Sequence, residues 1–248
     1  MWMRTPLSWA PVSRRTRVRY LSCSPCRSVG YSTAQACQQS LQQSQASVLA
    51  ETLRKDKHDC WGWIVYRTCY QDDHEWQHLK CYLQDNSERA LARSDVPALK
   101  KSLRWTFIED QAQFENASLD SLRSYFRERT KATYKREQPR AHGFVEAPRY
   151  MYFLKVVKHT TDNPDLTTAY GLSHIKLVKA DAEPLVIHET HDDDEAAYEA
   201  IDGCSDFDVG WMKIALNLTG PNCYESLYGS NEAWYAYYQR PPDELLSC

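Results

Sequence analysis

Two long amphipathic helices, each placed between apolar segments with strand character, limit the architecture that this chain can adopt. Residues 61–70 are rich in aromatic and β-branched residues, which favours a strand. Asp72 stands three residues before Glu75 in a capping-box arrangement, and apolar residues then recur at helical spacing. Residues 103–109 alternate as a second strand does, and Ser118 then caps the second helix. The order strand, helix, strand, helix, strand predicts right-handed crossovers.

The later part of the chain predicts antiparallel pairing. Residues 150–157 are apolar on both faces, as in a central strand, and the gap before residues 174–178 is too short for a crossover helix. Residues 211–216 supply a fifth strand, and a terminal helix contains Trp234 and ends before Pro241. We therefore predict an α+β fold, with a mixed, mainly antiparallel sheet of about five strands covered by helices. A ferredoxin-like core with insertions is the first candidate.

The first fifty residues differ from the rest in composition. Residues 1–50 hold six Arg, nine Ser and no acidic residue, whereas residues 51–248 carry 24 basic and 33 acidic residues. We predict a disordered or leader-like segment at 1–50 and a single α+β domain at 51–248. Arg and Ser without acids are typical of a mitochondrial transit peptide, although Pro6 and Pro11 interrupt an early helix. A mispredicted start is the other explanation for residues 1–50.

Nine cysteines are an odd number, and their spacing lacks the regularity of a secreted disulfide scaffold. Together with the lack of about 18 consecutive apolar residues for a membrane span, this predicts an intracellular, cytoplasmic protein, with mitochondrial import as the alternative. Cys23 and Cys26 form a CxxC pair without a second pair at zinc-ribbon spacing. Residues 188–195 are dense in His, Asp and Glu but match neither HExxH nor an EF-hand loop. We expect no metal and no cofactor.

Ionisable side chains gather where the first strand gives way to the first long helix. Arg67, Asp72, Asp73 and His74 lie within eight residues, at a strand–helix junction that can present charged groups to a ligand. The structural alternative is that one aspartate caps the helix while Arg67 pairs with an acid. Both interpretations remain open at this point.

The C-terminal residues are a second candidate for binding. Trp234, Tyr238 and Arg240 belong to the residue types that dominate binding hot spots. At helical spacing, the aromatic residues could equally pack against the sheet. Basic residues interleaved with aromatic ones at 121–149 resemble a single-strand-binding groove, but a net charge of −3 and the lack of an RNA-binding signature argue against nucleic acid.

Ordered motifs along the chain point to a family. Residues 61–76, WGWIVYRTCYQDDHEW, are similar to the pattern WGF-(V/I)-(V/I)-YRxxYxDDxxW, and further matches follow at 103–110, 149–154, 208–213 and 234–242. In these motifs the chain resembles a set of uncharacterised proteins from filamentous fungi, over roughly residues 60–242. The resemblance implies an intracellular fungal protein and brings no assigned activity, so it carries no catalytic residue over to this chain.

Two hypotheses for function follow. The first is a non-enzymatic module that binds another protein or a small ligand through aromatic and charged surfaces, because no group of residues demands catalysis. The alternative is a small hydrolase or transferase that uses Arg67, Asp73 and His74 in a pocket beside the first strand. An exposed aromatic patch would favour the binding module, and convergent ionisable groups in a concave pocket would favour the enzyme.

Overall fold

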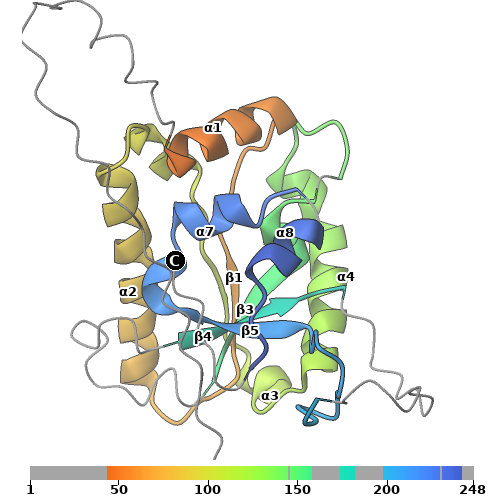
Figure 1. Ribbon diagram of the computed structural model, residues 1–248. Coiled ribbons are helices and arrows are strands. Elements are labelled where there is room, and N and C mark those ends of the chain that lie inside the picture. The colour runs from red at the N-terminus through yellow and green to blue at the C-terminus, as the bar shows by residue number, and fades with distance from the viewer. Residues whose placement is uncertain (1–43, 145, 158–173, 182–197, 230, 242–248) are drawn as a thin grey trace, which may run out of the picture. The chain divides into compact units, whose positions relative to one another are not determined.

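A computed structural model describes residues 44–144, 146–157, 174–181, 198–229 and 231–241. Every described residue belongs to one compact unit, Gln43–Cys248 (Figure 1). In the described part, the elements in chain order are α1 (Gln45–Asp56), β1 (Ile64–Arg67), α2 (Asp73–Ala92), the 3-10 helix η1 (Pro97–Ser102), β2 (Thr106–Ile108), α3 (Gln111–Phe114), α4 (Leu119–Glu137), α5 (Pro148–Met151), β3 (Tyr152–Val156), β4 (His174–Lys179), β5 (Trp211–Ala215), the 3-10 helix η2 (Leu216–Leu218), α7 (Pro221–Ser226) and α8 (Asn231–Tyr237).

The five strands form one mixed sheet in the order β2-β1-β3-β4-β5. β1 pairs in parallel with β2 and with β3, over three residue pairs in each ladder. β4 pairs antiparallel with β3 over four residue pairs and with β5 over five. The structure confirms the predicted α+β class and the mixed sheet of five strands, whose longer ladders are antiparallel. It also confirms the antiparallel pairing of the third and fourth strands.

The strand order differs from the ferredoxin-like core suggested by the sequence. A ferredoxin-like core contains a split βαβ unit, in which another strand lies between the two strands that a helix connects. Here β1 and β2 are direct neighbours, and α2 connects them. The connections β1–α2–β2 and β2–α4–β3 make the first three strands parallel. Apolar periodicity identifies strands but not their neighbours, which is why the sequence does not decide this order.

Helix boundaries follow the capping residues closely. Asp72 caps α2, and the Ser118 side chain caps α4 by accepting a hydrogen bond from the Ser121 N–H. The domain boundary expected at residue 50 lies inside α1, whose Leu49 and Leu53 are buried. The folded part of the chain therefore includes residues that the Arg- and Ser-rich composition had assigned to the leader.

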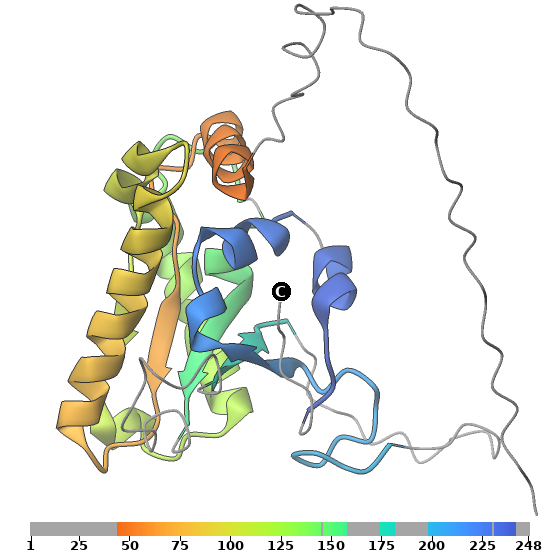
Figure 2. The same ribbon diagram turned by 60° about the vertical axis from the view of Figure 1, so that its left-hand side comes forward.

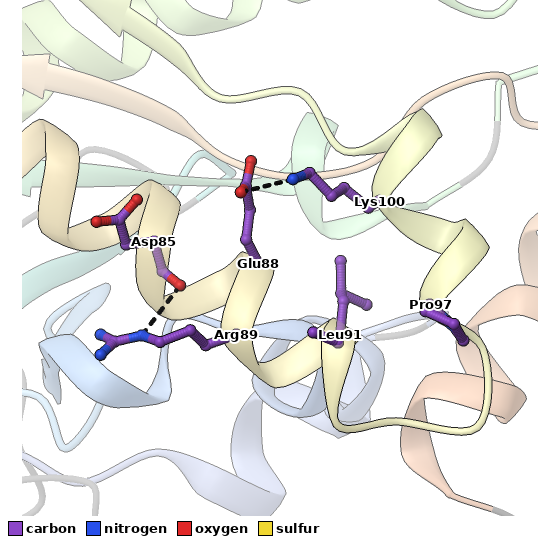
Figure 3. A pocket seen from close by; sticks show the side chains of 7 residues that line it. Asp85, Glu88, Arg89, Leu91, Pro97 and Lys100 are labelled. Atoms are coloured by element: carbon purple, nitrogen blue, oxygen red, sulfur yellow. Dashed lines mark hydrogen bonds and ion pairs between the residues drawn. The ribbon is translucent and has the colours of Figure 1, made fainter.

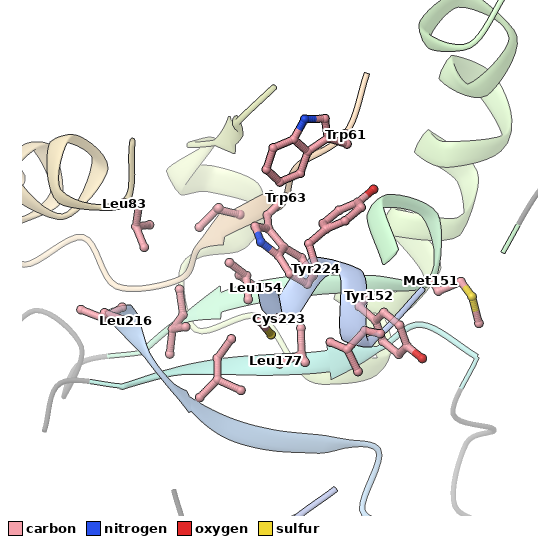
Figure 4. Packing of buried hydrophobic residues seen from close by; sticks show 14 of the residues in the cluster. Trp61, Trp63, Leu83, Met151, Tyr152, Leu154, Leu177, Leu216, Cys223 and Tyr224 are labelled. Carbon is pink, nitrogen blue, oxygen red and sulfur yellow. The ribbon is translucent and has the colours of Figure 1, made fainter. Parts of the chain in front are cut away.

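Helices cover both faces of the sheet (Figure 1, Figure 2). On one face, α1, α2, α7 and α8 pack over the larger of the two main buried apolar clusters, and α3 and α4 pack over the smaller one on the other face; a third, minor cluster of Tyr134, Ala147 and Tyr150 lies beside the end of α4. Neighbouring residues of β3 divide accordingly, because Leu154 joins the larger cluster and Phe153 the smaller. Within the larger cluster, the Tyr224 ring lies 5.2 Å from Trp61 and 5.3 Å from Trp63 (Figure 4).

A buried arginine ties α5 to the beginnings of two strands. Arg149 is 1% exposed, and its Nε and Nη2 lie 2.8 and 3.1 Å from the carboxylate of Glu137 at the end of α4. Its Nη1 donates to the carbonyls of Gly62 and Arg104, and Nη2 donates to the Thr106 hydroxyl. The guanidinium thus bridges the segments that lead into β1 and β2. Burial alone would raise the pKa of Glu137, but the bonds from Arg149 outweigh it and hold that pKa below its ordinary value.

Helix length and composition bear on membrane insertion. Within the described ranges, no helix is both long and apolar enough to span a bilayer. The two longest of these helices, α2 and α4, each present a charged outer face.

Candidate functional site

Contacts of the Arg67 side chain stabilise the connection between β1 and α2. Arg67 is 4% exposed, and its Nε donates to the Cys69 carbonyl at 3.0 Å while Nη2 lies 2.7 Å from Asp73 Oδ1. The guanidinium also lies over the Tyr70 ring, 4.4 Å from its centre, and 5.5 Å from the Trp76 ring. These contacts use the donors and the flat face of Arg67 within the protein.

The acidic residues of this junction have separate roles. The Asp72 carboxylate accepts hydrogen bonds from the backbone N–H groups of His74 and Glu75, at 2.8 and 3.0 Å, as a helix N-cap does. The Asp73 side chain is 85% exposed, although it forms the ion pair with Arg67. The His74 side chain is 88% exposed. The geometry fits the structural alternative, and ligand binding at this junction stays a prediction.

Changing Asp72 to Ala should lower the free energy of unfolding by about 1 kcal/mol, because two N–H groups at the start of α2 lose their acceptor. Urea denaturation followed by circular dichroism measures the effect. The exposed neighbour gives a matched control, since His74→Ala should stay within about 0.5 kcal/mol of the original chain. Equal stability of D72A and the original chain would contradict the capping role.

The C-terminal candidates divide between core and surface. Trp234 is fully buried, stacks on Tyr152 with ring centres 5.5 Å apart, and donates its Nε1–H to Asp208. The Tyr238 hydroxyl donates to the Phe207 carbonyl at 2.9 Å. These bonds attach α8 and the residues after it to the segment before β5.

A continuous row of rings leads from this core to the surface. Trp234 contacts Tyr238, with ring centres 5.4 Å apart, and Tyr238 meets Phe207 edge to face at 5.3 Å. Phe207 in turn lies 5.6 Å from Tyr198. The last two residues are 51% and 49% exposed, so the row ends in an open pair of rings. The sequence did not single out this pair, although two aromatic residues within a strongly acidic run are a signal that could have found it.

Arg240 completes this part of the surface. Its guanidinium carbon lies 5.0 Å from the centre of the Tyr198 ring, and its Nη2 donates to the Glu199 carbonyl at 2.6 Å. Glu199 and Asp206 are exposed beside the rings in sequence, and residues 198–210 contain no Lys or Arg. We call the surface formed by Tyr198, Glu199, Asp206, Phe207 and Arg240 the aromatic–acidic surface.

A hollow of about 440 Å³ elsewhere on the molecule has different chemistry. It lies between α2 and η1, and its lining includes the charged residues Asp85, Glu88, Arg89 and Lys100 (Figure 3). Lys100 Nζ lies 2.7 Å from Glu88, and Arg89 Nε donates to the Asp85 carbonyl at 3.3 Å. The ion pair between Glu88 and Lys100 neutralises two of the four charged side chains that line the hollow.

Metal binding finds no support in the described residues. Among them, no three His, Cys, Asp or Glu side chains gather as a metal site requires. The CxxC pair at Cys23 and Cys26 and the acidic run at 188–195 both lie outside the residues that the structure describes.

Comparison with known proteins yields no relative. No family model, no curated protein and no solved structure matches the chain. The resemblance to the proteins from filamentous fungi therefore stays a prediction, and function has to be argued from the fold and the surface.

Proposed function

We propose that this chain is a non-enzymatic binding module that recognises a basic segment of another protein through the aromatic–acidic surface. One observation carries the proposal. Tyr198 and Phe207 form an exposed ring pair, about half of each accessible to solvent, in a stretch without basic residues. Exposed aromatic residues that gather instead of being scattered mark interaction sites.

The charge around the rings selects the partner. Glu199 and Asp206 are exposed acids that would attract Lys or Arg, and aromatic faces bind cations in addition. Arg240 lies over Tyr198 within the same chain, which is an intramolecular example of the contact expected from the partner. A basic partner gains both from attraction to the acidic side chains and from contact of its cations with the rings, whereas an acidic partner would be repelled.

The support behind the rings favours a preformed site. The Tyr238 ring packs against the Phe207 ring, and the Tyr238 hydroxyl donates a hydrogen bond to the Phe207 carbonyl. Tyr238 in turn packs on the fully buried Trp234. A surface that is already ordered loses less conformational entropy on binding, which favours affinity. Of the candidates taken from the sequence, Trp234 and Tyr238 thus support the rings from behind, and Arg240 lies at the rim of the proposed site.

The hydrolase or transferase alternative receives less support. It relies on Arg67, Asp73 and His74, but Arg67 is buried with its guanidinium on Asp73 and Tyr70, while His74 is open to solvent. Opposed acid and base groups across a substrate, which such chemistry needs, are not formed by these side chains. The geometry therefore favours the binding module.

A fungal, intracellular and cytoplasmic setting is part of the same proposal. It is supported by the resemblance of residues 60–242 and by the free thiols of Cys60, Cys69, Cys81 and Cys204, which suit a reducing compartment. Mitochondrial import remains the alternative that the Arg- and Ser-rich residues 1–50 suggest.

Fluorescence anisotropy with a labelled arginine–glycine repeat peptide tests the proposed function. The full chain should bind this peptide, and the double variant Y198A/F207A should bind it about tenfold more weakly or worse, because both ring faces are lost. The matched control is Tyr235→Ala, which removes a 56% exposed tyrosine from α8 and should leave the affinity unchanged.

A second probe tests the role of charge. A glutamate–glycine repeat peptide of equal length should not bind measurably, and added salt should weaken binding of the arginine peptide. Equal affinity of Y198A/F207A and the original chain for the arginine peptide, or equal binding of both peptides, would overturn the proposal.

A further inference from the structure

A second hollow, of about 420 Å³, shares no residue with the aromatic–acidic surface. Residues from the start of α1, the end of α2, η2, α7 and the end of α8 line it. Among these elements, α7 lies beside α1 and α2 (Figure 1, Figure 2). The volume falls within the range of about 300–1,000 Å³ that small-molecule sites have. The polar residues of the lining are Gln45, Asn217, Asn222, Ser226 and Tyr237, and we call it the amide-lined hollow.

The chemistry of the amide-lined hollow is polar but uncharged. None of the described residues that line it is Asp, Glu, Lys, Arg or His, although 25% of the chain is charged. A charged ligand would leave its charge unpaired there, which is costly. An amide group, by contrast, both donates and accepts hydrogen bonds, as a hydroxyl group does. The hollow therefore suits an uncharged ligand that carries several polar groups.

Two of the amides are available to a ligand. Within the described ranges, the side chains of Asn217 and Asn222 make no hydrogen bond to the protein, and both residues are exposed. Gln45 Nε2 donates to Ser226 Oγ at 3.4 Å, a long bond that leaves the Gln45 carbonyl oxygen as an acceptor. The half-buried Tyr237 packs against the larger apolar cluster and adds a ring to the wall. Hydrogen-bonding groups and an aromatic ring thus line the same space.

Hydrogen bonds to the rest of the fold hold the segment that carries both asparagines. Trp63 Nε1 donates to the Thr219 carbonyl at 2.8 Å, and the Thr219 hydroxyl donates to the Leu216 carbonyl at 2.8 Å. Asn86 Nδ2 of α2 donates to the Asn217 carbonyl at 2.9 Å. Because this wall is already ordered, the protein would lose less conformational entropy when a ligand binds.

Small residues keep the hollow open. A Cβ atom added to Gly220, which precedes α7, would lie 3.8 Å from the Ala90 Cβ atom of α2, an ordinary van der Waals contact. Ala90 and Gly220 therefore face each other, and both line the hollow. Since Ala90 is exposed, a larger side chain at this position would occupy space that a ligand needs.

We propose that the amide-lined hollow is a binding site for a neutral sugar. A sugar carries several hydroxyl groups on a compact ring, and each of them can donate to and accept from an amide such as Asn217 or Asn222. The Tyr237 ring offers an apolar surface to the C–H groups of the sugar.

A nucleobase is the other common uncharged ring with polar groups. It is bound largely by stacking on aromatic faces. Tyr237 is the one aromatic residue among the described residues of the lining, whereas four others carry an amide or a hydroxyl group. The lining therefore favours the sugar. This site is independent of the role proposed for the aromatic–acidic surface.

Isothermal titration calorimetry of the full chain tests the site. Glucose, galactose, mannose and maltose are titrated separately, and we expect at least one of them to bind. Ala90→Phe should raise the Kd of that sugar about tenfold or more, because the added ring fills the hollow. The matched control is Ala132→Phe, which places the same ring at an exposed position of α4 and should leave the Kd unchanged.

Removal of the two amides tests the hydrogen bonds. Asn217→Ala combined with Asn222→Ala should raise the Kd about tenfold or more, because donors and acceptors for the sugar hydroxyls are lost. The thermal unfolding midpoint without ligand should change little, since neither side chain bonds to the protein within the described ranges. Gln77→Ala, at an exposed position of α2, is the control and should leave the Kd unchanged.

The chemistry of the ligand gives a further readout. The uronic acid of the sugar that binds should bind about tenfold more weakly, because the described lining offers no cation to its carboxylate. Adenosine, the probe for a nucleobase, should also bind more weakly than the sugar. The proposal would be overturned by failure of all four sugars to bind, by tighter binding of adenosine or the uronic acid, or by equal Kd values in A90F and A132F.

Discussion

Replacement of Arg149 by methionine should destabilise the protein by about 3–5 kcal/mol, the range found when one partner of a buried ion pair is removed. The guanidinium is 1% exposed and bonds to Glu137, to the carbonyls of Gly62 and Arg104, and to the Thr106 hydroxyl. Its loss leaves the half-buried Glu137 carboxylate with the Tyr150 hydroxyl as its remaining side-chain donor among the described residues, and it removes one donor from each of the two carbonyls. Denaturation in urea, read by tryptophan fluorescence, gives the change in the free energy of unfolding.

A double variant separates the charge effect from packing. Arg149→Met combined with Glu137→Leu should recover part of the lost stability, because no uncompensated charge then remains buried. The original chain should also lose stability as the pH falls below about 4.5, the ordinary pKa of glutamate, since the pKa of Glu137 is lowered in the folded state. A single R149M variant that loses less than about 1 kcal/mol would show that the bridge is not required.

Replacement of Trp234 by alanine should cost about 3–5 kcal/mol, as expected for a fully buried aromatic side chain. The change removes the stack on Tyr152, the hydrogen bond to Asp208 and the packing beneath Tyr238. We expect weaker binding of the arginine peptide as well, because Phe207 loses the support of the row of rings. Thermal unfolding and peptide anisotropy measure the two effects.

A conservative variant serves as the control for this prediction. Trp234→Phe keeps a ring against Tyr152 but removes the donor to Asp208, so its loss of stability should be smaller than that of W234A. Peptide affinity in W234F should stay close to that of the original chain. An alanine variant with undiminished stability would contradict the placement of Trp234 in the core.

Much of the fold follows from local sequence signals. Asp72 and Ser118 cap the helices that they were predicted to cap, and the five apolar segments became five strands. The order of the strands in the sheet could not be predicted in the same way, because apolar periodicity identifies each strand but not the strands with which it pairs. The boundary predicted at residue 50 falls within α1, because it was drawn from composition, and composition does not show that Leu49 and Leu53 are buried.

The functional surfaces depend on contacts between distant parts of the chain. Phe207 and Tyr198 meet through a loop, and Tyr238 reaches Phe207 from thirty-one residues away in sequence. Arg67, by contrast, was expected to pair with one of the two neighbouring aspartates in the structural interpretation, and the observed ion pair is with Asp73.

The central claim is that the aromatic–acidic surface binds basic protein segments. Two-dimensional NMR of the isotope-labelled full chain, titrated with the arginine–glycine peptide, tests it most directly. We predict that the shifts that change will belong to residues 198–210 and Arg240, while those of Arg67 to His74 stay in place. Changes concentrated at Arg67 to His74, or none at residues 198–210 at saturating peptide, would contradict the account.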